Sequence, residues 1–317
     1  MMSFKHVMAI HEMMDNPALS AKDFMNYLKA LGDGGTVEVY EVPYEAPEDP
    51  QYNCEFIRIH IAGTEGKLAL GEKSQYPTLG VIGRLGAQAA IPARIGQVSD
   101  ADGSTVALAT AASLWEGVVK GARLKGDVII TTHVATHVKI TPHEPVDFMG
   151  MPVSSATMNK FEVLPEMDAI ISVDTSKGNT IINHKGMALS ATAKQGYILR
   201  VAPDLVKLME LTTGKPAVTF PITTQDITDY DNGVYHFNSI MQPHVATEAP
   251  VVGLAITAAS VVPGSETGAS YITELNEATR FVHEVAKQYT WKRASFYDSG
   301  EYDKLVARYG SLDFLRH

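Results

Sequence analysis

Short, continuously apolar runs alternate with helical segments over most of this chain, and this alternation limits the fold more than any other feature. The apolar runs cover residues 79–82, 128–130, 169–173 and 251–256, and the segments with helical spacing cover residues 104–120, 203–211 and 272–288. A strand that is apolar along its whole length is buried on both faces, as in a parallel sheet covered by helices. We therefore expect an α/β fold with a mostly parallel or mixed central sheet and helices on both of its faces.

The first 75 residues follow a different pattern, of two helices and then two strands. Ser20 is a good N-cap for the second helix, and Asp23 three residues later supports its first turn. Residues 37–42 and 56–61 alternate between apolar and polar side chains, as half-buried strands do. No repeat or linker separates this part from the rest. We therefore expect one domain of residues 1–317, in which residues 1–75 pack on the main sheet.

The composition argues against several classes of function. The chain has 36 acidic and 26 basic residues and a net charge of −10, so it lacks the basic surplus that nucleic acids or anionic membranes require. The longest mostly apolar run, residues 251–262, is too short to span a bilayer, and the N-terminal residues lack the pattern of a signal peptide. The single cysteine, Cys54, cannot form an intrachain disulfide. We expect a cytoplasmic protein whose Cys54 packs within a strand.

A glycine-rich stretch at residues 80–86 invites comparison with nucleotide-binding loops. Its spacing is G-x-x-G-x-x-G, whereas the dinucleotide motif is G-x-G-x-x-G, and the sequence has no P-loop or G-x-S-x-G elbow. We expect these glycines to permit close packing where a strand ends. A nicotinamide-dependent oxidoreductase is therefore only a third hypothesis.

Carboxylates follow two of the expected strands. Asp100 and Asp102 lie directly before the helix at residues 104–120, and Asp174 follows the run at residues 169–173. Asp102 or Ser104 could simply cap the helix, but two close carboxylates repel each other unless a cation or a proton intervenes. A charge at the end of a buried strand is either paired or functional, because an isolated buried charge is costly. A helix cap and a metal site both remain open.

Three histidines, His133, His137 and His143, lie close together in a segment rich in β-branched residues. On a helix, two histidines four residues apart can bind one metal ion, but on a strand they lie about 13 Å apart at ~3.3 Å per residue. At most one of them can join a given metal site, and we favour His133 because it closely follows a buried run. Asp226 and His236 belong to an acidic, turn-rich stretch that does not match a calcium loop.

Much of the chain resembles a known family. Residues 79–104 and 216–220, with PITTQDIT at residues 221–228 and GVYHFNSIMQP at residues 233–243, are similar to a bacterial and archaeal family called domain of unknown function 1177. The likeness extends over nearly the whole chain. The family implies no activity.

A more distant resemblance, over residues 77–174, is to the co-catalytic zinc exopeptidases and their phosphorylase/hydrolase-like architecture. Residues 77–86 resemble the strand that ends in their G-H-x-D motif, residues 99–103 their bridging-aspartate turn, and residues 169–174 the strand of a further aspartate ligand. Arg84 and Gly86 replace the histidine and aspartate of G-H-x-D, and Thr132 and His133 replace an acidic pair. Residues 264–268 lack the last histidine. The resemblance therefore implies this fold with a degenerate metal site.

We therefore expect a metal-dependent hydrolase of a small peptide or amide, with zinc as the divalent metal. Asp100, Asp174 and His133 would bind the metal, or His133 would act as general base. Arg84 would bind a substrate carboxylate, or would itself replace the lost metal charge beside Asp100. The other candidates for substrate contact are Asp102, Asp226 and His236. The alternative is a non-catalytic protein that binds a small molecule on the same fold.

Apolar residues near the N-terminus indicate assembly. Phe4, Met8, Met13 and Met14 would give a short helix an apolar surface, and the run at residues 251–262 would add to it. We expect a homo-oligomer, most simply a two-fold dimer. The alternative is that the methionines complete the core of their own chain.

Overall fold

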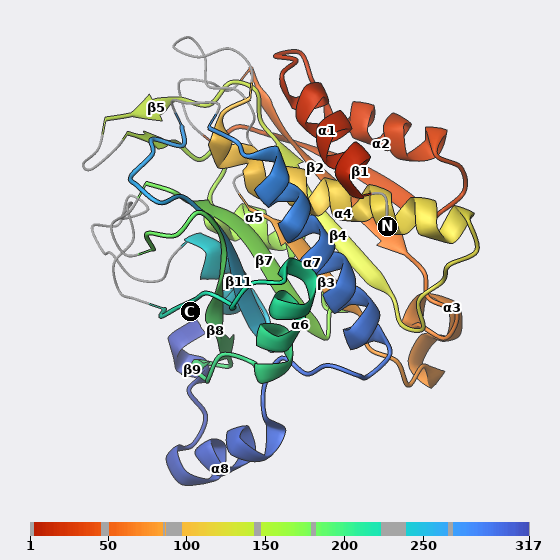
Figure 1. Ribbon diagram of the computed structural model, residues 1–317, viewed down its shortest axis with the longest axis vertical. Helices are drawn as coiled ribbons and strands as arrows, with labels where there is room; N and C mark the ends of the chain where they lie inside the picture. The colour runs from red at the N-terminus through yellow and green to blue at the C-terminus, as the bar shows by residue number, and fades with distance from the viewer. Residues whose placement is uncertain are drawn as a thin grey trace.

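The computed structural model describes residues 3–45, 51–84, 86, 97–142, 147–178, 182–222, 239–265 and 269–316. Its main sheet has the strand order β1-β2-β4-β3-β7-β11-β8-β10, with β9 paired to β8 (Figure 1). The strands are β1 (Thr36–Pro43), β2 (Asn53–Ile61), β3 (Leu79–Gly83), β4 (Val128–Val134), β7 (Ala169–Ser176), β8 (Gly186–Lys194), β9 (Tyr197–Ile198), β10 (Thr219–Phe220) and β11 (Val251–Thr257), and a separate pair is formed by β5 (Ile140–Thr141) and β6 (Phe148–Met149). The α-helices are α1 (Ser3–Met14), α2 (Ala21–Ala30), α3 (Lys67–Leu70), α4 (Asp102–Val119), α5 (Ser155–Glu162), α6 (Pro203–Thr213), α7 (Ile272–Thr290) and α8 (Ser299–Tyr309), and the 3₁₀ segments are η1 (Gly71–Lys73), η2 (Ser99–Ala101), η3 (Ser239–Ala246) and η4 (Asp313–Arg316).

Each of the four apolar runs forms a central strand of this sheet. β4, β3, β7 and β11 are parallel to one another, whereas β2 is antiparallel to β4 and β8 is antiparallel to β11. The prediction of a mixed, mostly parallel sheet is therefore confirmed. The hairpin of β1 and β2 is hydrogen-bonded to β4, so the N-terminal segment extends the same sheet.

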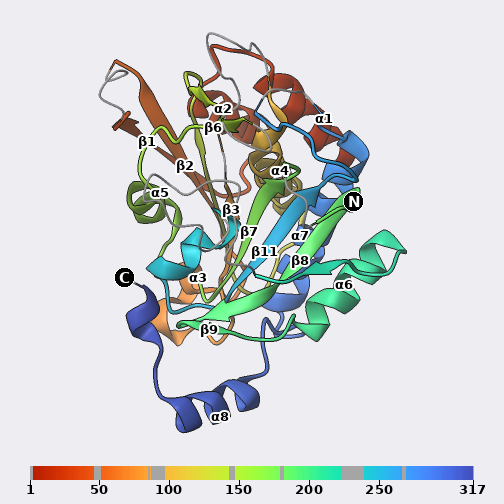
Figure 2. The same ribbon diagram turned by 90° about the vertical axis from the view of Figure 1, so that its left-hand side faces the viewer.

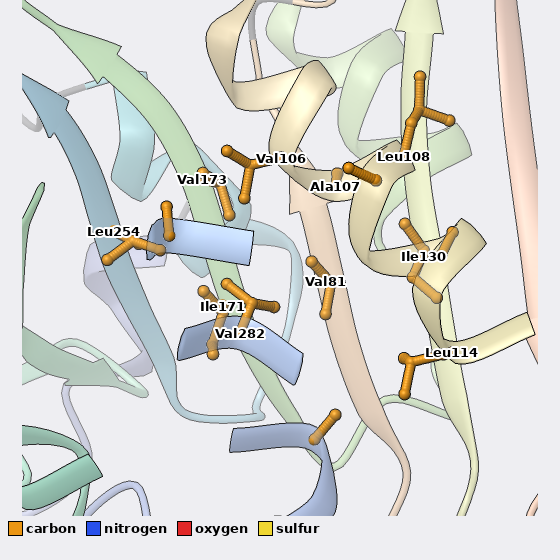
Figure 3. Close-up of a cluster of buried hydrophobic side chains, with 14 of the residues drawn as sticks. Val81, Val106, Ala107, Leu108, Leu114, Ile130, Ile171, Val173, Leu254 and Val282 are labelled. Atoms are coloured by element: carbon orange, nitrogen blue, oxygen red, sulfur yellow. The ribbon is translucent and has the colours of Figure 1, made fainter. Parts of the chain in front are cut away.

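Helices cover both faces of the sheet (Figure 2). Each face has its own hydrophobic core. Ile171 and Leu254 belong to the core under α4 and α7, together with Val106 and Val282 of those helices (Figure 3). Ile170, the neighbour of Ile171 in β7, instead belongs to the core on the η3 face. Successive side chains of a strand point to opposite faces, so a strand buried on both faces must be apolar throughout.

The expected N-cap of the second helix is confirmed. The Ser20 side chain accepts a hydrogen bond at the start of α2 from the backbone N–H of Lys22, and the Asp23 side chain accepts one from the backbone N–H of Ser20. This capping box satisfies backbone donors that the first helical turn leaves without partners.

The apolar surface that we expected for assembly is only partly present. The run at residues 251–262 contributes β11, which lies between β7 and β8 and is buried along its whole length. That strand cannot also contact a second copy, whereas Val261, beyond its end, is 37% exposed, so assembly itself stays a prediction. On α1, Met14 is buried, whereas Phe4 and Met8 are 45% and 53% exposed.

No helix among the described residues is both long and apolar enough to cross a membrane.

Candidate functional site

Three of the residues singled out in the sequence lie side by side where the central strands end. Arg84 directly follows β3, and the parallel registers of β3 with β4 and β7 place it between His133 and Asp174. All three are at least 97% buried. In open α/β sheets, ligands bind at the carboxyl ends of the parallel strands, so this row lies where a site is expected.

A fourth residue, Glu162, joins this row from the last position of α5. One of its carboxylate oxygens accepts a hydrogen bond from Arg84 Nη1 at 2.9 Å, and the other lies 2.6 Å from His133 Nδ1. The backbone carbonyl of Glu162 also accepts a hydrogen bond at 2.9 Å from the Thr131 hydroxyl, which ties the end of α5 to β4. The Glu162 side chain is fully buried, so both contacts are shielded from water.

These contacts define how the imidazole of His133 is held. With its proton on Nδ1, the ring donates to Glu162 and leaves Nε2 as a proton acceptor. A buried carboxylate that orients an imidazole in this way also stabilises the imidazolium that forms when Nε2 takes up a proton. His137 belongs to a different environment, because its ring stacks on Tyr52 at 3.8 Å between centroids.

A second charged group lies at the start of α4. Lys177, which directly follows β7, places its ammonium nitrogen 2.5 Å from one carboxylate oxygen of Asp102 and 2.8 Å from the carbonyl of Ala269. The Ser270 hydroxyl donates to the other oxygen of Asp102 at 2.5 Å. The side chains of Asp102 and Lys177 are both fully buried. Asp102 is therefore part of an internal ion pair, and the hydroxyl of Ser104, the other expected cap, contacts Thr132.

Asp100 sits beside this ion pair in η2. Burial raises the pKa of its carboxyl to about 7, with a further contribution from the negative charge of Asp102, while Lys177 acts in the opposite direction. Near neutral pH, Asp100 therefore exists in both protonation states. Repulsion between the two carboxylates is relieved by Lys177, which pairs with Asp102, and by the raised pKa of Asp100, which favours its neutral form.

The glycines of residues 80–86 permit close packing, as expected. A Cβ on Gly83 would lie 2.8 Å from Cα of Ser104, and a Cβ on Gly86 would lie 1.8 Å from the carbonyl oxygen of His133. Real Cβ atoms do not approach other atoms so closely. Glycine thus lets the first turn of α4 approach the end of β3. As a result, the ion pair of Asp102 and Lys177 and the group around Glu162 both lie at the carboxyl ends of the central strands.

The described residues do not fit a zinc centre. Within the described part of the chain, no three histidine, cysteine, aspartate or glutamate side chains come close enough to hold one ion. Arg84 and Lys177 supply positive charge beside the carboxylates, and Nδ1 of His133 is engaged by Glu162. The ligand set of Asp100, Asp174 and His133 therefore stays a prediction. Three further candidates, His143, Asp226 and His236, lie outside the described residues.

Sequence reasoning missed both Glu162 and Lys177. For Glu162 a signal existed, because Ser154 is a good N-cap and begins the short helix that ends at Glu162. For Lys177 we find no signal, because a lysine after a strand is ordinarily exposed.

Comparison with solved structures confirms the expected exopeptidase-like fold. Glutaminyl cyclase from Porphyromonas gingivalis has a TM-score of 0.54 and 10% identity, covering 92% of this chain and 97% of the other. Cytosol aminopeptidase from Coxiella burnetii has a TM-score of 0.50 and 13% identity, covering 88% and 68%. A Zn-dependent exopeptidase from Parabacteroides distasonis has a TM-score of 0.49 and 13% identity, covering 90% and 96%. At these identities the first two likenesses show the fold alone, and nothing is argued from the third, whose TM-score is below 0.5.

Sequence comparison gives the family but no activity. No curated protein matches the sequence. The family described as "Protein of unknown function (DUF1177)" matches residues 45–317, which is most of the chain. The chain therefore belongs to the DUF1177 family.

Proposed function

We propose that this chain hydrolyses a small amide or peptide, with His133 as the general base. The observation that carries this proposal is the buried contact of 2.6 Å between His133 Nδ1 and Glu162 at the carboxyl edge of the sheet. An imidazole whose Nδ1 is fixed by a carboxylate presents Nε2 to a water molecule and can take its proton as the water attacks a carbonyl carbon. The imidazolium then gives this proton to the amide nitrogen as the C–N bond breaks, which releases an amine and a carboxylic acid.

Glu162 and Arg84 would support this step in different ways. Glu162 holds the ring of His133 and stabilises the imidazolium formed during attack. Arg84 balances the charge of Glu162 through Nη1, and a guanidinium has five N–H donors. The remaining donors suit a carboxylate on the substrate, so we propose a substrate with a free carboxylate near the amide.

Zinc dependence is the more specific form of this hypothesis. Zinc would activate the attacking water by lowering its pKa. The described residues do not fit such a centre, so the steps above rely on the side chains alone. Elemental analysis of protein purified without added metal tests the zinc form. Stoichiometric zinc that is lost in both His133→Ala and Asp174→Asn would support it, and zinc-free active protein would refute it.

The alternative is a non-catalytic binding protein, and one observation favours it. Arg84 and Lys177 are buried in ion pairs with carboxylates of their own chain. Such pairs can organise a rigid polar site without supporting a reaction. On this hypothesis, a small carboxylate-bearing amide would bind but would not be cleaved.

One experiment separates the two functions. Dipeptides and N-acyl amino acids are incubated with the wild type, His133→Ala and, as a surface control, Glu41→Gln, and new amine groups are measured. Hydrolysis predicts turnover in the wild type and the control, with a loss of kcat/KM of about 10²–10⁴-fold in His133→Ala. Binding of a probe by calorimetry without turnover of any compound would refute hydrolysis and support the binding protein.

A further inference from the structure

A cavity of about 260 Å³ lies between the C-terminal parts of α4 and α7. Its walls include Gly117 of α4 and His283 of α7. Gly117 comes fifteen residues after Asp102 in the same helix, which at 1.5 Å per residue corresponds to ~22 Å along the helix axis. The cavity is therefore separate from the candidate site at the start of α4.

The lining of this cavity combines an apolar interior with positive charge. Leu114 and Leu124 are buried, and the Trp291 ring is partly exposed. Arg123 and Arg293 also line the cavity, and no acidic residue does, although the whole chain has a net charge of −10. Neither arginine pairs with a carboxylate within the described part of the chain, and the Arg293 guanidinium lies 4.6 Å from the centroid of the Trp291 ring.

His283 adds an uncharged polar group to the wall. Burial and, to a smaller extent, the nearby charge of Lys287 lower its pKa to about 4. Its Nδ1 lies 3.1 Å from the Ser113 hydroxyl, so the ring is held in one orientation. Lys287 itself is paired with Glu284 at 2.6 Å, which leaves the two arginines as the cations that can receive an anion.

Gly117 gives an independent indication that the space is kept open. A Cβ at this position would meet no atom closer than the carbonyl oxygen of Ala122 at 3.7 Å. Glycine destabilises a helix relative to alanine, and alanine would fit here without strain. Compared with alanine, Gly117 therefore makes the helix less stable and leaves unfilled the space where its side chain would enter the cavity.

We propose that this cavity binds a small carboxylic acid with an aromatic or other apolar body. The leucines and Trp291 would contact the body, and Arg123 and Arg293 would bind the carboxylate, which a guanidinium matches in shape and charge. The volume is slightly below the ~300 Å³ at which pockets for drug-sized ligands begin, so the ligand is smaller than a drug. Cations near the ends of α4 and α7 would also be favoured by the helix dipoles alone, and that explanation predicts no ligand.

The probes are 3-phenylpropionate, 3-phenylpropanol and 3-phenylpropylamine, which share one body and differ in charge. The chain has two tryptophans, so the fluorescence of Trp291 can be followed alone in a Trp115→Phe background. Calorimetry on the unmodified chain gives the same comparison if that background is poorly folded. We expect the acid to bind, and the alcohol and the amine to bind at least about tenfold more weakly.

Paired variants connect the binding to this cavity. Gly117→Leu should abolish binding by filling the space, whereas Gly117→Ala should retain it and raise Tm. Arg293→Gln should weaken binding at least about tenfold, whereas Arg308→Gln, which removes a guanidinium near a different aromatic ring, Tyr309, should not. Equal binding of acid and alcohol, full binding by Gly117→Leu, or no binding at millimolar concentration would each overturn the proposal.

Discussion

The contacts of Glu162 provide a quantitative test of the structure, through the substitution Glu162→Gln. The change preserves the shape of the side chain but removes its charge and replaces one acceptor oxygen by a donor. Arg84 Nη1 and His133 Nδ1 each lie against a different oxygen of this carboxylate, so one of them must lose its acceptor. Arg84 is 3% exposed, and water therefore cannot solvate its unpaired charge.

Breaking a buried ion pair by removing one partner destabilises a protein by about 3–5 kcal/mol. Since domains are stable by only about 5–15 kcal/mol, Glu162→Gln should remove about a fifth or more of the free energy of unfolding. Urea denaturation at pH 7, followed by circular dichroism, measures the change. The control is Glu41→Gln, which breaks the exposed pair with Lys22 and should have little effect.

A double variant tests the reasoning further. Arg84→Met removes the cation that Glu162→Gln leaves unpaired, so the double variant should lose clearly less stability than the sum of the two single variants. A loss below about 1 kcal/mol in Glu162→Gln, or additive losses in the double variant, would show that these buried charges are not coupled as the structure has them.

The remaining predictions concern pH, packing, thiol reactivity and assembly. The folded pKa of Asp100 is about 7, above its ordinary value of 3.8, so its contribution to stability is present below pH 3.8 and is lost as the pH rises to about 7. This loss amounts to at most about 4.5 kcal/mol at about 1.4 kcal/mol per pKa unit, and Asp100→Asn should flatten the pH dependence of the free energy of unfolding. Leu254→Ala should cost about 2–5 kcal/mol by leaving a cavity between β11 and the helices, and a loss like that of exposed Val119→Ala would contradict the core packing. Cys54 is fully buried, and burial raises the pKa of its thiol well above the ordinary value, so maleimides should label it only after denaturation. We also expect a dimer whose contact includes Phe4 and Met8; light scattering on Phe4→Asp/Met8→Asp should give the mass of one chain, and that mass for the wild type at micromolar concentration would contradict assembly.

The central sheet could be predicted because its strands are buried on both faces. A strand of this kind has an unbroken apolar run in its sequence. The four predicted runs correspond to the strands β3, β4, β7 and β11. β8 could not be found in this way, because Gly186–Lys194 contains serine, threonine and alanine, although eight of its nine residues are buried. The Ser190 hydroxyl accepts a hydrogen bond from the backbone N–H of Gly253, and the Thr192 hydroxyl donates one to the carbonyl of Phe296. Both partners are distant in the sequence, so no local pattern indicates them.

The candidate site was predictable only in part for a similar reason. Arg84, Asp174 and His133 stand at the ends of recognisable strands, so the sheet itself brings them together. Their partners come from elsewhere in the chain, since Glu162 belongs to a short helix 29 residues after His133, and Lys177 lies 75 residues from Asp102. Pairing over such distances depends on the whole topology, and a local motif cannot encode it.

The two edges of the main sheet have a consequence for how copies of the chain behave when concentrated. An unpaired strand edge is a template on which another strand can add, and proteins protect such edges with short strands, charges or proline. At one edge, β10 has only two residues. At the other, β1 pairs only with β2 in the described part of the chain, and it exposes Glu38 and Glu41 and ends in Pro43. A second β1 adding at this edge would have to accommodate these charged side chains and the proline, which has no N–H to donate, so both edges of the sheet resist edge-to-edge aggregation of concentrated copies.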